Sequence, residues 1–162
     1  MNSSSLASRF REVFLNGKWI ANTNVQEQLL DLSLVEAQKE TSGLNTIAKL
    51  TFHLNYYVAG VLNVFEGGEL EIRDRFSFDL SQMQSEADWE ALKTTLFTNA
   101  NRFADHVEQM SSEKLDTVFV EEKYGDYRRN VEGMIEHGYY HLGQIVLLKK
   151  LLEKSWKPDH VA

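Results

Sequence analysis

The feature that most constrains what this sequence can fold into is that it has one proline, Pro158, close to the C-terminus. A proline inside a helix removes a backbone hydrogen bond and kinks or breaks the helix. Residues 1–157 contain no such break, so the sequence permits long helices. Apolar residues recur at the three- and four-residue spacing of a helix face in four separate segments.

These four segments are bounded by recognisable start and stop residues. Gly17 follows the first, the Gly67–Gly68 pair follows the second, and Ser85 precedes two acidic residues at the start of the third. Glycine is common just after a helix, while serine and acidic residues favour the first turn. The pattern predicts helices over residues 6–16, 45–66, 86–110 and 126–154.

The connections between these segments are long. Residues 17–44 contain a short helical piece around Gln26–Leu32, residues 67–85 have little helical period, and residues 111–125 include LDTVFVEE, whose composition is β-like. Four amphipathic helices that each need a partner favour a bundle, and long connections allow crossovers between non-adjacent helices. We therefore expect an all-α four-helix bundle, in a single domain over residues 1–162.

Composition excludes several classes of site and partner. The chain has no cysteine, so any metal ion must be bound by His, Asp or Glu. A formal net charge of −7 without a Lys/Arg run argues against nucleic acid as a partner. The N-terminus lacks the apolar core of a signal peptide, and no segment reaches the about 18 apolar residues of a membrane span. We expect a cytoplasmic protein with no membrane association.

Three histidines lie on apolar helix faces. His137 and His141 are one helical turn apart on one stripe, and His53 interrupts a similar stripe in the second helix. Each can be a neutral core histidine with hydrogen-bonded ring nitrogens, although a cluster is harder to satisfy than one. Alternatively, the three imidazoles bind a divalent metal ion and leave positions open for water or substrate.

Other polar residues on these helices are weaker candidates. His106 is a competing third ligand, but its place beside Asp105 near a helix end is typical of solvated surface. Asn99 lies on the apolar stripe of the third helix, as a core amide or as a hydrogen-bond partner of a ligand. Glu136 is rotated about 100° from His137 and is not expected to face the metal. We assign His160 to solvated surface.

The segments TFHLNYYVAGVLNVFEG around His53 and IEHGYYHLGQIVLLKKLL around His137 and His141 resemble the DinB/YfiT-like superfamily of metal-dependent proteins. The likeness covers nearly the whole chain. It implies a four-helix bundle of up-down-down-up topology, with a divalent ion, often nickel or zinc, bound by His53, His137 and His141. It also implies a homodimer.

Activity is less well defined by this resemblance. Relatives include transferases that use low-molecular-weight thiols, a thiol-dependent isomerase and proteins described as hydrolases, so we expect a small-molecule substrate and either thiol transfer or hydrolysis. A thiol would have to be a cosubstrate, because the chain has no cysteine. Tyr57, Tyr140 and the 67–85 connection are candidates for the pocket lining. The alternative is a non-catalytic, stress-associated bundle whose metal is structural or absent, with Tyr139–Tyr140 on an association surface.

Overall fold

The computed structural model describes residues 2–155, so Pro158 and His160 lie outside the described part. All regular elements within that part are helical, and it contains no strand, which confirms the all-α prediction. The elements are α1 (Ser3–Arg11), the π-helical turn η1 (Glu12–Asn16), α2 (Val25–Leu30), α3 (Leu34–Ala37), α4 (Ile47–Phe65), the 3-10 turn η2 (Asp74–Phe76), α5 (Glu86–Gln109), α6 (Ser112–Leu115), the 3-10 turn η3 (Glu122–Tyr124) and α7 (Tyr127–Ser155).

The helix boundaries follow local capping chemistry. Ser85 accepts a hydrogen bond from the backbone of Asp88, whose carboxylate in turn accepts one from Ser85, so a capping box starts α5. The hydroxyl of Thr46 accepts a hydrogen bond from the backbone amide of Lys49 and so caps the start of α4. The first helix begins earlier than residue 6, because Asn2 caps it. The β-like 111–125 region forms a single isolated bridge, Val118 to Asp126, rather than a strand.

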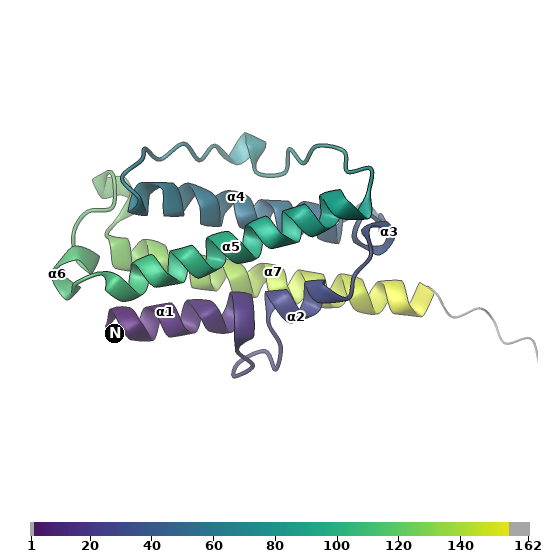
Figure 1. Cartoon of the computed structure of the whole chain (residues 1–162), viewed down its shortest axis with the longest axis horizontal. Coiled ribbons are helices and arrows are strands. Elements are labelled where there is room, and N and C mark those ends of the chain that lie inside the picture. The colour runs from purple at the N-terminus through teal and green to yellow at the C-terminus, as the bar shows by residue number, and fades with distance from the viewer. Residues whose placement is uncertain (1, 156–162) are drawn as a thin grey trace, which may run out of the picture.

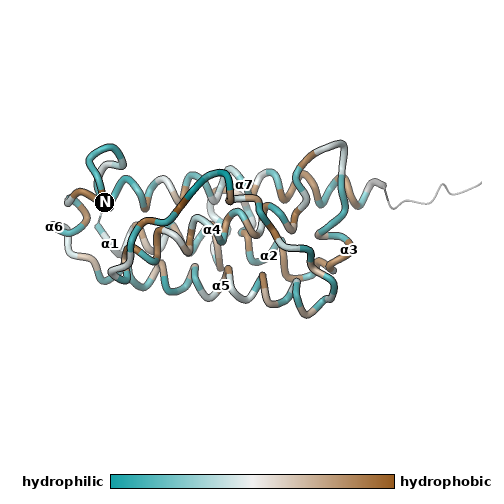
Figure 2. Tube along the Cα trace, turned by 90° about the horizontal axis from the view of Figure 1, so that it is seen from above, coloured by the Kyte–Doolittle hydropathy of each residue, from teal (hydrophilic) through white to brown (hydrophobic). Residues whose placement is uncertain are grey.

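The α1–η1 segment, α4, α5 and α7 pack side by side (Figure 1). α5 contacts α4 and α1, and α7 contacts the same two helices. Brown apolar and teal polar stretches alternate along each helix, as amphipathic helices require (Figure 2). The apolar faces enclose one core that includes fully buried Phe10, Phe14, Trp89 and Phe103. Within residues 2–155, no helix combines the length and apolar character that a membrane span needs.

The connection between α4 and α5 positions the site described below. It runs back along α4, from one end of the molecule to the other (Figure 1). Tyr56 fixes it to α4, because its hydroxyl donates to the carbonyl of Arg73 and accepts from the amide of Arg73. Residues 73–78, which include η2, therefore lie against α4, and Ser77 lies next to His53 in the first half of that helix.

Candidate metal centre

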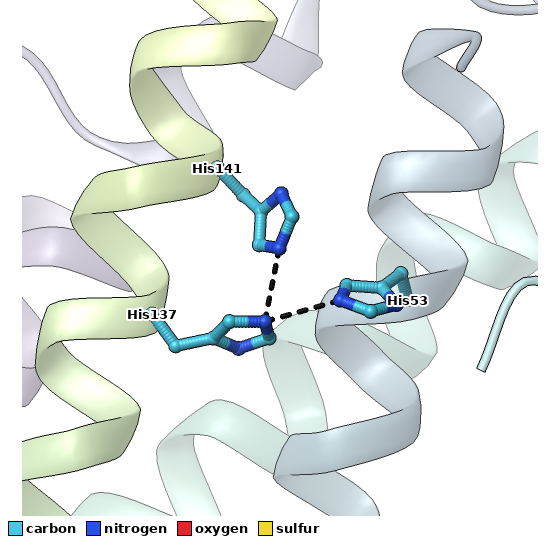
Figure 3. Close-up of side chains that lie close together, drawn as sticks. All are labelled: His53, His137 and His141. Carbon is cyan, nitrogen blue, oxygen red and sulfur yellow. Dashed lines mark hydrogen bonds between the residues drawn. The ribbon is translucent and has the colours of Figure 1, made fainter. Parts of the chain in front are cut away.

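Three imidazoles converge between α4 and α7 (Figure 3). The Nε2 atom of His137 lies 3.1 Å from Nε2 of His53 and 2.9 Å from Nε2 of His141. His137 and His141 are brought together by one turn of α7, whereas His53 reaches them from α4. The structure thus assembles the three histidines that the sequence analysis singled out, in a group whose ligand atoms all lie within 4.8 Å of one another.

The surroundings of these rings keep them neutral. Burial lowers the pKa of His53 from 6.5 to about 4, and electrostatic repulsion from His141 adds to this effect. Burial also lowers the pKa of His137 to about 4, with further contributions from the other two histidines. The pKa of His141 is lowered by burial as well, against an opposing hydrogen bond to Gln144. Neutral imidazoles keep a nitrogen lone pair, which a metal ion requires.

Acceptors outside the cluster set the tautomers of two rings. Nδ1 of His53 lies 3.2 Å from the carbonyl oxygen of Ser77, and Nδ1 of His141 lies 2.7 Å from Oε1 of Gln144. Both acceptors assign the proton to Nδ1 and leave the lone pair on Nε2, directed at the centre of the cluster. Metal-binding histidines are commonly oriented in this way by a carbonyl or carboxylate behind the ring.

Coordination of a metal ion explains the arrangement of the three Nε2 atoms better than hydrogen bonds among the three rings do. If the cluster were purely hydrogen-bonded, His137 would have to donate one Nε2 proton to both neighbours, and its buried Nδ1 has no partner among the described residues. Around a tetrahedral ion with Zn–N distances of 2.0–2.1 Å, nitrogens lie about 3.3 Å apart. The separations of 3.1 and 2.9 Å from Nε2 of His137 to the other two rings need to expand by only a few tenths of an ångström, and the third separation, between His53 and His141, lies within 4.8 Å.

Aromatic side chains surround the cluster. The ring of Phe78 stacks on His53 with centroids 4.0 Å apart, and Tyr57 contacts both His53 and His137 edge-on. The Tyr57 hydroxyl donates to Oδ1 of Asp74 at 2.8 Å. Tyr57 is predictable from the sequence, whereas Ser77, Phe78 and Asp74 are not, because they come from a connection of irregular backbone and one 3-10 turn that carries no periodic signal.

The remaining candidates lie elsewhere. His106 is about two-fifths exposed, with Nε2 3.4 Å from Oε1 of Glu66, and is outside the cluster. Asn99 donates to Asn55 at 2.9 Å, as a satisfied amide, and not to a histidine. Glu136 is exposed and pairs with Arg129, as expected from its rotation away from His137. Tyr140 touches His141 edge-on, but its side chain is mostly exposed.

A pocket of about 510 Å³ lies beside the cluster, which it borders through Tyr57, although none of the three histidines lines it. Its walls come from α4, the 67–85 connection, the segment before α7 and the first turns of α7. Tyr57 forms part of the wall nearest the histidines, and Met134 lies one helical turn before His137. The expected contribution of Tyr57 and of the long connection to the lining is therefore seen, whereas Tyr140 does not line this pocket.

The sequence matches one known protein family over most of its length. The model of the DinB family matches residues 10–152, which include all three histidines and nearly all of the helical core. Comparison with curated proteins and with solved structures found no match.

Proposed function

Because the chain belongs to the DinB family, we propose that it binds a divalent metal ion, zinc or nickel, through Nε2 of His53, His137 and His141, and uses it to act on a small molecule. The observation that carries the proposal is the convergence of three neutral imidazoles, two of them oriented by Ser77 and Gln144. The 67–85 connection along α4 supports the up-down-down-up bundle that the family resemblance implies (Figure 1).

Residues of the chain prepare such a site in three ways. The carbonyl of Ser77 and the amide of Gln144 hold two rings in the ligating tautomer. Phe78 and Tyr57 cover the cluster with apolar surface and reduce access of bulk water. A bound divalent ion would supply Lewis acidity, which lowers the pKa of a coordinated water or thiol and prepares it for hydrolysis or transfer. A low-molecular-weight thiol is the cosubstrate that we propose for the transfer reaction.

Metal content tests the first part of the proposal. Wild-type protein prepared in metal-replete buffer should contain one equivalent of zinc or nickel by elemental analysis. Single His53→Ala, His137→Ala and His141→Ala variants should lose most of it, whereas His106→Ala, which changes a histidine outside the cluster, should not. Wild-type protein without stoichiometric metal, or loss of metal in His106→Ala with retention in His53→Ala, would show that the ligand set is wrong.

A second measurement separates the enzyme from the non-catalytic alternative. An enzyme needs a position on the ion that a small ligand can reach. Cobalt-substituted protein should therefore change its visible absorption when a thiol or a small chelating anion is added. An unchanged spectrum would favour a structural ion. The cytoplasmic location stays a prediction, and the homodimer is part of the proposal, with Tyr140 and Leu147 as exposed apolar residues on α7.

A further inference from the structure

The pocket beside the histidines lies along one face of α7. From its N-terminal end, this helix contributes Arg129 and Asn130, then Gly133 and Met134 to the pocket lining, and His137 follows one turn later. Residues three and four apart share a helix face. On α7 the lining therefore begins at the guanidinium of Arg129 and ends at Met134, one turn before His137, and Tyr57 is the lining residue that contacts the histidine cluster. Over two helical turns, with a rise of 1.5 Å per residue, the backbone positions of Arg129 and His137 are about 12 Å apart.

The wall between these two ends is mainly apolar. Val61 of α4, Leu70 and Ile72 of the connection, Phe119 and Met134 line it. Gly133 leaves the pocket open on the α7 side, since a Cβ atom placed there would have no heavy atom within 4 Å. Pockets of this size that combine apolar walls with a few polar groups are typical of small-molecule sites.

Two charged residues line the pocket, Asp74 and Arg129, and they differ in the hydrogen-bonding groups that they leave for a ligand. Oδ1 of Asp74 already accepts a hydrogen bond from the hydroxyl of Tyr57. The guanidinium of Arg129 contacts only Glu136 among the described residues, through Nη1 at 3.2 and 3.4 Å, in a pair whose side chains are both more than half exposed. Such a pair is weak, and the other N–H donors of Arg129 remain for a carboxylate, which a guanidinium binds in a forked geometry.

We propose that this pocket binds a small organic acid with an apolar body, with its carboxylate on Arg129 and its opposite end directed at the histidine cluster. The pocket itself requires no metal, but the statement that its ligand is the substrate rests on the proposed function. Specificity would come from the separation of the two ends, because a ligand of matching length places its carboxylate and its reacting group correctly at once.

Three probes of the same shape test the charge preference. They are 4-phenylbutyrate, 4-phenylbutanol and 4-phenylbutylamine, titrated by NMR into zinc-treated and into metal-free protein. The acid should bind about tenfold more tightly than the amine, because its carboxylate pairs with Arg129. In Arg129→Gln this preference should disappear, while Lys150→Gln, a matched change of an exposed cation on α7 outside the pocket lining, should retain it.

Two glycines of α7 provide a matched test of location. A Cβ atom added at Gly133 or at Gly143 would meet open space, but only Gly133 lines this pocket. Gly133→Leu should fill the pocket and weaken binding of 4-phenylbutyrate at least about tenfold, whereas Gly143→Leu should leave it unchanged. Thermal melting checks that both variants fold; if Gly133→Leu does not, Arg129→Gln decides, because its side chain is more than half exposed.

The results separate this inference from the proposed function. Tighter binding of the amine, or unchanged binding of the acid in Gly133→Leu, would overturn the inference even if the protein holds zinc by elemental analysis. An acid preference that depends on Arg129 and Gly133 supports the inference. The same preference in a protein that never retains metal would overturn the metal-dependent function, while the pocket would still be a binding site for an organic acid.

Discussion

His53 and His137 make the stability of the metal-free protein depend on pH. Burial lowers both pKa values from 6.5 to about 4, so between these pH values the unfolded chain binds more protons than the folded chain. The free energy of unfolding must then fall as pH falls through this window. Since one pKa unit corresponds to about 1.4 kcal/mol, we expect a loss on the order of 2 kcal/mol for each histidine between pH 7 and pH 5.

Urea denaturation of metal-free protein at pH 7, 6 and 5 measures this loss. His53→Phe serves as the control, because it keeps a ring of similar size and removes one titrating group. It should show a shallower dependence on pH than the wild type. An identical pH dependence in the two proteins would mean that His53 does not titrate as its burial requires.

Gln144 controls the orientation of His141 without touching the centre of the cluster. Its Oε1 lies 2.7 Å from Nδ1 of His141. Gln144→Ala should weaken metal binding by about 10–100-fold, the range typical when an orienting partner of a metal-binding histidine is lost. Gln144→Glu keeps an acceptor and should bind at least as tightly as wild type. Competition with a chelator of known affinity measures this; equal affinities in wild type and Gln144→Ala would contradict it.

The packing of α1 and η1 against α7 depends on a glycine next to a candidate ligand. A Cβ atom at Gly138 would lie 2.7 Å from the ring of Phe14, so the two helices must move apart to accept one. Gly138→Ala should destabilise the protein by about 1–3 kcal/mol, partly offset by the better helix propensity of alanine, and should weaken metal binding by shifting His137. Gly143→Ala, which meets open space, should be neutral or stabilising.

Thermal melting and chelator competition on these two alanine variants provide the comparison. Equal melting temperatures would mean that the contact between Phe14 and Gly138 relaxes without cost. A destabilised Gly138→Ala with unchanged metal affinity would mean that the movement of α7 does not reach His137.

The long helices can be predicted from sequence because burial of one face imposes a repeat on the apolar residues. His53, His137 and His141 interrupt such repeats, so the sequence alone marks them as candidates. It does not mark residues 73–78, because Ser77 contributes a backbone carbonyl and Phe78 is placed by an irregular chain path. Gln144 could have been found, since it follows His141 by three residues on the same helix face. The short α3 and α6 depend on caps at Ser33 and Ser111 and show no repeat.

A metal ion at this cluster would connect two helices that are distant in the chain. His53 and His137 are 84 residues apart, and α4 and α7 both contact other helices of the core. Unfolding either helix would release the ion, so the ion should stabilise the whole molecule and not only its surroundings. Free zinc at 100 times its dissociation constant adds about 2.7 kcal/mol to the free energy of unfolding. For a chain of this length, that corresponds to a rise of about 5–11 °C in melting temperature.

Scanning calorimetry with and without zinc checks this, and the rise should grow with the logarithm of the zinc concentration. His106→Ala should show the full rise, because His106 lies outside the cluster. His137→Ala should show almost none, since its Nε2 is the atom that lies close to both other histidines. A rise of equal size in His137→Ala would place the stabilising ion elsewhere on the protein. A rise confined to a separate low-temperature transition would mean that α4 and α7 do not unfold together with the rest of the core.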